Sequence, residues 1–390
     1  MTRQTYGVLY IQMMLEVIIY IADAVLAVVL VLMGRQIYRA VKHVPHVYTS
    51  RIKGEVDLPS VTVCIPARNE THALTDCLQR VLASTYERLE IIVLDDVSTD
   101  DTPALIRSFA SEGVRFVKGT ALPQGWLGKN HALQGLLHEA SGSYVLFMDV
   151  DTVLAPNAIE NMVRHALSHR LSMLSVLPRR EDGWRFSVLA APLRYFWELL
   201  FKRPASPGAS SNAWLVRRSV MHTTFNGFHD LKNAIQPESK IAATLARTNE
   251  YEFLIGSEQF GVGYEKKWTS QLMTSVRLLY PLLNKEMALA ILAVLDLALL
   301  LVPFVALVLW AAGVEVSPLF FTINALLAVG FMLLYGLYTR RVWRKGYVLG
   351  ALLWPLLIVQ EISILIASVI QYKRKAVTWK GRLIRPEAQN

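Results

Sequence analysis

Four long apolar stretches constrain the fold of this chain more than any other feature of its sequence. They occupy residues 8–33, 287–314, 318–338 and 347–370, and each is long enough for a membrane-spanning helix, which needs about 20 mostly apolar residues. Of all 390 residues 53% are apolar, too many for one water-soluble domain, but the segment between the first two stretches has an ordinary soluble composition. The sequence therefore predicts a water-soluble middle held to a membrane at both ends.

The chain divides on this basis into an anchor, a soluble middle and a membrane tail. A secretory signal peptide is the alternative for the first stretch, but that stretch is too long, has only Arg3 as a basic start and ends in Arg35 instead of a small-residue cleavage site. We expect a membrane anchor at 1–36, a basic juxtamembrane linker at 37–57, an α/β domain at 58–280, membrane segments at 281–372 and a basic tail at 373–390.

Much of the positive charge lies beside the apolar stretches, although the formal net charge of +9 could suggest nucleic acid. Such flanking residues are typical of cytoplasmic loops and of contact with anionic lipid headgroups. No zinc-finger spacing or DNA-reading helix accompanies them, so we expect a membrane and no nucleic acid as partner. The pattern predicts a multi-pass protein of the cell membrane with a cytoplasmic middle domain. The flanking residues are Arg35, Arg39, Lys42, Arg51, Lys53, Arg340, Arg341, Arg344, Lys345, Lys373, Arg374, Lys375, Lys380 and Arg382.

The same charge rule conflicts with four complete spans. If the N-terminus is outside and the middle domain inside, three further spans leave the basic tail outside, whereas the rule places both the 340–345 loop and the tail inside. One segment is therefore expected to be re-entrant or interfacial. Residues 347–370 are the first candidate because they contain Pro355 and Glu361.

The middle of the chain alternates between strand-like and helix-like patterns. Such alternation predicts a largely parallel sheet, in which ligands bind at the carboxyl ends of the strands. Three of the strand-like runs end in polar clusters, where that rule places a site. The strand-like runs are 61–65, 90–94, 114–118 and 144–148, and the helix-like runs are 71–83, 101–111 and 130–140.

The strongest chemical signal is the run VLFMDVDT, in which a strand ends in Asp149 and Asp151. Carboxylates two residues apart on an extended chain project to the same side, so both can face one polar volume. Mg²⁺ and Mn²⁺ prefer such oxygen ligands together with phosphate oxygens. The alternative is a pair of capping residues at a strand end. The position of the pair in an alternating domain favours a metal that neutralises a leaving diphosphate.

A second strand, in IIVLDDVSTDDT, ends in Asp95 and Asp96. These carboxylates can accept hydrogen bonds from a ribose or a base. A capped turn between strand and helix accounts well for residues 98–102. It accounts poorly for two adjacent acids, which repel each other unless a donor lies between them.

Two loops supply further candidates. In PARNE, Pro66 and Ala67 give a rigid backbone against which a flat base can pack, and Arg68 and Glu70 offer polar contacts, although an ordinary loop also fits. In LPQGWLGKNHALQGL, glycines allow close backbone approach and Lys129 stands beside a helix start, which favours phosphate binding over a flexible loop with a solvated lysine.

These four segments, in this order and spacing, strongly resemble the family 2 glycosyltransferases, which have the GT-A fold. The resemblance covers about 58–275, and the flanking membrane segments resemble lipid-modifying members, including ceramide glucosyltransferases. LPQGWLGK and VTWKGR look like the bacterial carotenoid and hopanoid-associated branch. The resemblance implies that Asp95 and Asp96 contact the nucleoside, that Lys129 helps to hold the donor, and that Asp149 and Asp151 bind the sugar nucleotide and Mg²⁺ or Mn²⁺.

The resemblance also implies an inverting, single-displacement transfer in which one carboxylate deprotonates the acceptor. The family pattern places that base in a Glu-Asp pair about ten residues after a Gly-Gly-Phe turn. Here the text is FNGFHDLKNAIQPESKIAA, in which Pro237 replaces the first acid and Glu238 the second. We expect Glu238 to be the base, with Asp230 or a differently built site as the alternatives.

A second departure is YEKKW, where the family often has Gln-x-x-Arg-Trp on an amphipathic helix over the acceptor. Lys267 and Trp268 fill the last two positions, and Lys lacks the bidentate fork of Arg. We expect both to contact the substrates, although Trp268 would also suit a membrane interface. Trp214 is a further candidate wall of the acceptor pocket.

The leading prediction is an inverting transferase that moves a hexose from a nucleotide-diphosphate sugar, most plausibly a UDP-sugar, to a lipid-like acceptor at the cytoplasmic membrane face. Asp151 and Glu238 would be its catalytic residues. A processive polysaccharide synthase is one alternative, but four spans at most provide little for a polymer channel. The other is a membrane protein that binds nucleotide sugars without turning them over, and a transporter is disfavoured because the spans contain few ionisable groups.

Overall fold

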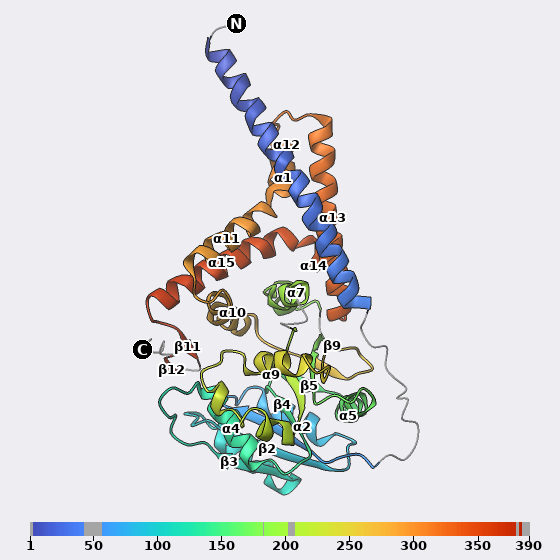
Figure 1. Cartoon of the computed structure of the whole chain (residues 1–390), viewed down its shortest axis with the longest axis vertical. Helices are drawn as coiled ribbons and strands as arrows, with labels where there is room; N and C mark the ends of the chain where they lie inside the picture. The colour runs from blue at the N-terminus through green and yellow to red at the C-terminus, as the bar shows by residue number, and fades with distance from the viewer. Residues whose placement is uncertain (1–2, 43–56, 182, 202–206, 380–381, 384–390) are drawn as a thin grey trace.

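A computed structural model describes residues 3–42, 57–181, 183–201, 207–379 and 382–383. The α/β domain occupies one end of the molecule and the long apolar helices the other, with a layer of shorter helices between them (Figure 1). Residues 43–56 of the expected linker, with Arg51 and Lys53, and residues 384–390 of the expected tail lie outside the described residues.

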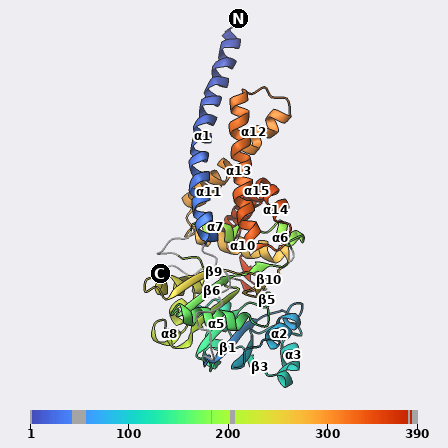
Figure 2. The same cartoon turned by 90° about the vertical axis from the view of Figure 1, so that its right-hand side faces the viewer.

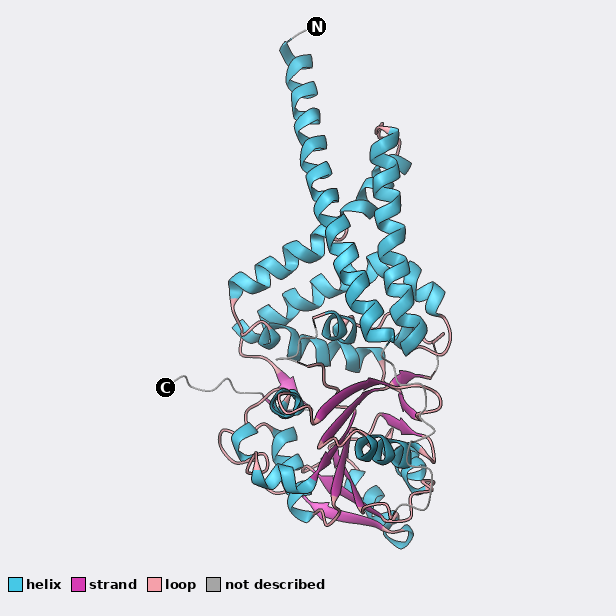
Figure 3. Ribbon diagram, turned by 45° about the vertical axis from the view of Figure 1, so that its right-hand side comes forward, coloured by secondary structure: helices cyan, strands magenta, loops and turns pink. Residues whose placement is uncertain are grey.

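The α/β domain is built on a central sheet in the strand order β3-β2-β1-β4-β8-β6-β9 (Figure 3). All its pairings are parallel except those of β8, which is antiparallel to both neighbours. The expected α/β fold with a mostly parallel sheet is confirmed. The strands are β1 (Val61–Ala67), β2 (Leu89–Asp95), β3 (Val114–Lys118), β4 (Tyr144–Met148), β6 (Met173–Leu177), β8 (Ala213–Arg217) and β9 (Tyr251–Ile255).

Alternating side chains of the strands supply two apolar cores, one on each face of the sheet. In β1, Val63 and Ile65 belong to the cluster that includes α2, whereas Cys64 belongs to the cluster that includes α4. This follows from the period of two along a strand.

The helices of the domain are α2 (Leu74–Leu82), α3 (Thr102–Ser108), η1 (Ala110–Glu112), α4 (Gly128–Glu139), α5 (Ala158–Ser168), α8 (Arg218–Thr223), η2 (His229–Leu231) and α9 (Pro237–Ala246). A small second sheet contains β5 (Thr152–Leu154), β10 (Val262–Tyr264) and β7 (Arg179–Arg180).

Short helices form a layer between the sheet and the apolar helices. They are α6 (Phe186–Leu189), α7 (Arg194–Leu200) and α10 (Trp268–Leu282), and Figure 1 shows α7 and α10 beneath α11 and α15. The apolar helices are α1 (Arg3–Lys42), α11 (Met287–Leu299), α12 (Val302–Ala311), α13 (Pro318–Val342), α14 (Tyr347–Leu352) and α15 (Trp354–Lys373).

Within the described part of the chain, three helices are long and apolar enough to cross a membrane, namely Val17–Ala40, Pro318–Val342 and Trp354–Lys373. The expected stretch 287–314 is divided between α11 and α12, which are bent by 41° and could form a fourth span. The stretch 347–370 is also divided, between α14 and α15, and Pro355 stands in the first turn of α15. The first backbone N–H groups of a helix have no partner within the helix, so a proline at this position breaks no hydrogen bond.

Helix α15 lies on the layer of short helices, whereas α1 and α13 extend away from the α/β domain (Figure 2). The Ser368 hydroxyl accepts a hydrogen bond of 3.0 Å from Tyr280 N in α10, and Tyr372 donates one of 2.8 Å to Arg277 O. After α15, the hairpin of β11 (Thr378–Trp379) and β12 (Arg382–Leu383) lies back beside the α/β domain (Figure 1).

Two glycines allow the α/β domain to contact the loop that follows α13. A Cβ atom on Gly183 would lie 1.3 Å from Lys345 O, and Gly346 has a φ of +75°. The backbones of Gly183 and residues 345–346 thus cross closely. Beside this crossing, Arg344 N donates a hydrogen bond of 3.1 Å to Arg180 O in β7. The crossing ties the small sheet directly to the apolar helices.

Candidate active site

A cavity of about 310 Å³ lies at the carboxyl ends of β1, β2 and β4, beneath α10. The parallel strands bring side chains from well-separated stretches of sequence to this edge. Of the predicted site residues, nine line the cavity: Pro66, Ala67, Arg68, Glu70, Asp96, Lys129, Asp149, Asp151 and Glu238.

Asp95 and Asp96 have different surroundings although they are adjacent. Asp96 lines the cavity, whereas the Asp95 carboxylate accepts hydrogen bonds of 3.2 and 3.3 Å from Ser98 N in the turn after β2. Arg68 donates hydrogen bonds of 2.5 Å to both Asp96 O and Val97 O, so the end of β1 and the turn after β2 are held together. Of the two acids, only Asp96 therefore lines the cavity.

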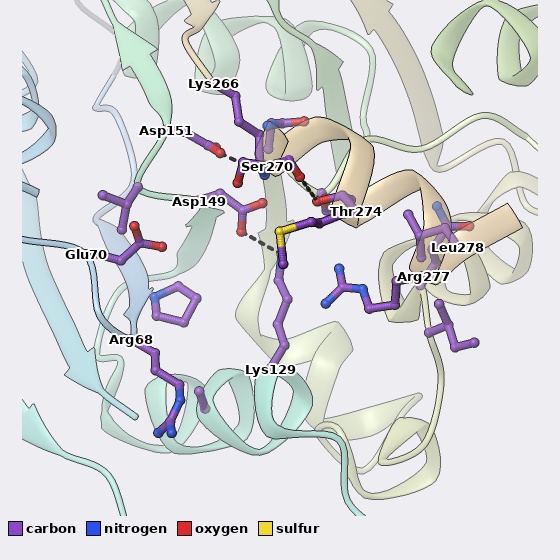
Figure 4. A pocket seen from close by; sticks show the side chains of 18 of the residues that line it. Arg68, Glu70, Lys129, Asp149, Asp151, Lys266, Ser270, Thr274, Arg277 and Leu278 are labelled. Carbon is purple, nitrogen blue, oxygen red and sulfur yellow. Dashed lines mark hydrogen bonds and ion pairs between the residues drawn. The ribbon is translucent and has the colours of Figure 1, made fainter. Parts of the chain in front are cut away.

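Asp149 and Asp151 lie in the middle of the cavity, each beside a lysine. Asp149 Oδ1 is 2.6 Å from Lys129 Nζ, and Asp151 Oδ2 is 2.9 Å from Lys266 Nζ (Figure 4). Lys266 is largely buried, which disfavours its charge, but nearby Tyr264 and Asp151 raise its pKa, so it is a cation. In each pair the lysine balances the charge of the carboxylate. The ammonium groups of these lysines are also of the kind that binds phosphate oxygens.

The same carboxylates fit a hard divalent cation. Carboxylate oxygens are ligands that Mg²⁺ and Mn²⁺ prefer. Asp151 Oδ1 is buried and has no hydrogen-bond partner among the residues that the structure describes, so an acceptor atom is left for an ion. Asp149 and Asp151 are therefore the residues that would hold the metal.

Glu238 lies in the first turn of α9, with only 3% of its surface exposed, and it lines the cavity. Burial raises the pKa of its carboxyl, against the opposing effect of nearby Lys129. Pro237 occupies the first turn of the helix, where its missing N–H costs nothing. Asp230, the alternative base, is exposed in η2 and is not among the residues that line the cavity.

Lys267 and Trp268 lie outside this cavity. Both line a neighbouring groove of about 640 Å³, and Trp268 Nε1 donates a hydrogen bond of 2.9 Å to Ala190 O. The residue before them, Lys266, is the one that enters the cavity. The two lysines stand in the turn between β10, which ends at Tyr264, and α10, which begins at Trp268, and both line the groove, but only Lys266 of the two also lines the cavity.

Several cavity residues carry no motif that sequence reasoning could find. Arg194 and Tyr195 come from α7, Tyr264 from β10 and Arg277 from α10. The available signal was an arginine next to a run of aromatic residues, as in RYFWELL. Trp214, expected as an acceptor wall, is instead a core residue, 1% exposed and stacked on Phe147 at 4.5 Å between ring centroids.

A second group of potential metal ligands lies elsewhere. His165, His169 and Glu252 have ligand atoms within 4.8 Å of one another, and the two imidazole rings stack at 4.2 Å. His165 Nε2 is 2.8 Å from Glu252 Oε2, which is an ordinary hydrogen bond. None of the three is among the residues that line the cavity, so this group has no part in the function proposed below.

The comparisons with known proteins agree with this fold and site. Residues 62–225 match the family model described as "Glycosyl transferase family 2". The match covers most of the α/β domain and agrees with the resemblance to family 2 glycosyltransferases. Over most of its length the chain also has the fold of the mannosyltransferase PcManGT from Pyrobaculum calidifontis, solved with GDP-Man and Mn²⁺, with a TM-score of 0.55 at 20% identity over 90% of this chain and 97% of that one. The GT-A fold is thereby confirmed.

Curated relatives match a shorter segment. The chain is 34% identical over 122 residues to the 4,4'-diaponeurosporenoate glycosyltransferases of Staphylococcus aureus strains USA300 and NCTC 8325 / PS 47. The match covers 30% of this chain and 32% of theirs, so it spans about a third of the length of these relatives.

Proposed function

We propose that the protein is an inverting glycosyltransferase that moves a hexose from a nucleotide-diphosphate sugar, such as a UDP-sugar, to a hydroxyl or carboxyl group of a lipid-like acceptor. The observation that carries this proposal is the convergence of Asp96, Asp149, Asp151 and Glu238 on one cavity beneath α10. The family match and the curated glycosyltransferase relatives support the reaction class.

The cavity suits the two substrates in different ways. Pro66, Ala67 and Asp96 form the end for the nucleoside, since a flat base can pack on the first two while the carboxylate accepts hydrogen bonds from a ribose or base. Lys129 lies where the diphosphate would be, beside Asp149. A divalent cation held by Asp149 and Asp151 would neutralise negative charge on the departing diphosphate.

Glu238 is the proposed base. An acceptor oxygen attacks the anomeric carbon from the side opposite the diphosphate, the carbon–oxygen bond to the diphosphate breaks with its electron pair, and the Glu238 carboxylate takes the proton of an acceptor hydroxyl. Attack from the opposite side inverts the anomeric configuration. A carboxylate acceptor is already ionised and needs no such proton transfer.

The course of the C-terminal helices supports a common side of the membrane for the α/β domain and the basic residues after α15, and the positive-inside rule makes that side cytoplasmic. Thr378 lines the cavity, so the chain after α15 returns to the side of the α/β domain. The segments between residues 281 and 372 must then cross the membrane an even number of times, although three candidate segments lie there. We propose that α15, which packs on α10, lies in the interface, whereas the α11–α12 pair and α13 cross.

A direct assay tests the proposal. The full chain, purified in detergent with Mn²⁺, is given UDP-glucose or GDP-mannose labelled in the sugar, together with a lipid extract, and the lipids are then examined by mass spectrometry. We expect a lipid whose mass has increased by one hexose. A protein that only binds nucleotide sugars would leave the donor intact, and a polysaccharide synthase would yield a ladder of polymers.

A further inference from the structure

The cations of the cavity fall into two groups. Arg68, Lys129 and Lys266 belong to the β1 end, to α4 and to the turn after β10, and contact two backbone carbonyl groups, Asp149 and Asp151, respectively. Arg194 and Arg277 line the same cavity but come from the layer of short helices, α7 and α10. Figure 4 shows Arg68 and Glu70 on one side of the cavity and Arg277 on the other, with Lys129 and Asp149 between them.

The surroundings of the two arginines favour an added anion. Arg194 stacks on Tyr195, with its guanidinium carbon 4.3 Å from the ring centroid, and its buried Nε has no hydrogen-bond partner among the described residues. Removal from water, followed by the charge of Arg194, lowers the pKa of Arg277. Burial also disfavours the charge of Arg194, but nearby Tyr195 and Glu198 outweigh it and raise the pKa of Arg194, so its guanidinium stays charged. An anion that contacts both guanidinium groups would offset the repulsion between them.

The position of the pair indicates which substrate carries this anion. The nucleoside end of the cavity is formed by the ends of β1 and β2, and the metal ligands follow β4. Arg277 lies on α10, which packs against α15, and beside it Met273 and Leu278 give the cavity an apolar wall. A group that arrives from the membrane reaches this end first, because α7 and α10 are the elements nearest to the apolar helices (Figure 1).

We propose that Arg194 and Arg277 form a binding site for a carboxylate or phosphate on the lipid-like acceptor. The inference rests on the function proposed above, and it narrows the acceptor to an amphiphile with an anionic group. Arginine suits this task because its planar guanidinium binds carboxylate and phosphate oxygens in a bidentate manner.

Binding measurements on the full chain in detergent test this site without requiring turnover. The probes are palmitate, hexadecyl phosphate and hexadecanol, which share one alkyl chain, and UDP or GDP with Mn²⁺. The variants are Arg194→Gln, Arg277→Gln and Arg277→Lys, and Arg247→Gln, at an exposed residue after α9, is the matched control.

We expect the wild type to bind at least one anionic amphiphile more tightly than hexadecanol. Each Gln variant should weaken that binding by about tenfold, the loss of one charge-assisted contact, while nucleotide binding stays within about twofold. Arg277→Lys should fall between Gln and wild type, because Lys keeps the charge without the fork. Comparison of palmitate with hexadecyl phosphate tells which anion the site prefers.

Two results would overturn the inference. Equal affinity of the wild type for hexadecanol and both anions would show that no anion is recognised, and this comparison needs no variant. A loss of nucleotide binding as large as the loss of amphiphile binding would show that the arginines hold the donor's phosphates. If amphiphile binding depends on the arginines but no nucleotide binds to the wild type, the anion site stands and the proposed transferase function fails.

Discussion

Lys129 and Asp149 form an ion pair at the centre of the cavity, with 2.6 Å between Nζ and Oδ1. Lys129 lies in the first turn of α4, and Asp149 directly follows β4, so the pair joins the start of a helix to the end of a strand. In this position the lysine neutralises a carboxylate that we propose as a metal ligand, beside the proposed position of the diphosphate. The pair links two candidate residues found separately in the sequence.

Replacement of Lys129 by Met should weaken the binding of UDP or GDP in the presence of Mn²⁺ by about tenfold, which corresponds to about 1.4 kcal/mol. The physical reason is the loss of a cation beside the phosphates. Isothermal titration of the full chain in detergent measures the effect. Lys240→Met, at an exposed position on α9, is the control, and equal affinities of the two variants would contradict the assignment.

Asp151→Ala should abolish transfer and remove the dependence of nucleotide binding on Mn²⁺, because it deletes the buried carboxylate oxygen left for a metal. The protein should stay folded, since the variant removes a charge from a cavity wall and not from the apolar core. Circular dichroism and nucleotide titrations with and without Mn²⁺ check both points. Asp101→Ala, at an exposed residue before α3, serves as the control, and a wild-type rate in Asp151→Ala would refute the role.

Glu238→Gln should lower transfer to a hydroxyl acceptor by about 10²-fold or more while donor binding persists, because the amide cannot accept the proton. Burial raises the pKa of Glu238, and the base must be ionised, so the wild-type rate should fall as the pH drops through a value above that of an ordinary glutamate. A pH–rate profile of the wild type measures this fall in the transfer rate. Asp230→Asn should keep both rate and profile, and an inactive Asp230→Asn would move the base to that residue.

Gly183→Ala should destabilise the protein, because the added Cβ would lie 1.3 Å from Lys345 O, and backbone must move to relieve the overlap. Gly34→Ala in α1 is the matched control, since a Cβ there meets no atom within 4 Å. Thermal unfolding of the full chain in detergent should show a lower midpoint for Gly183→Ala than for Gly34→Ala. Indistinguishable midpoints would mean that the crossing with the loop after α13 contributes little to stability.

The sequence by itself determined the features that depend on local periodicity. Strand-like runs place β3 at Val114–Lys118 and β4 at Tyr144–Met148 as expected, and Asp149 follows the point where the apolar run of β4 ends. Alternation of strands and helices is enough to predict a parallel sheet with its site at the carboxyl ends. Chain length and apolarity are likewise enough to locate the membrane-proximal segments.

Tertiary structure alone decided which side chains enter the cavity. The sequence could not show that Asp96 and not Asp95 lines it, because that depends on the hydrogen bonds from Ser98 N. The packing of β10, α7 and α10 decides in the same way that Lys266 and not Lys267 lines the cavity. It also decides that Arg194 and Arg277 line it together. The face of a strand or helix on which a residue lies depends on its near neighbours in the sequence. Its position in a cavity depends on contacts between segments that are far apart in the chain.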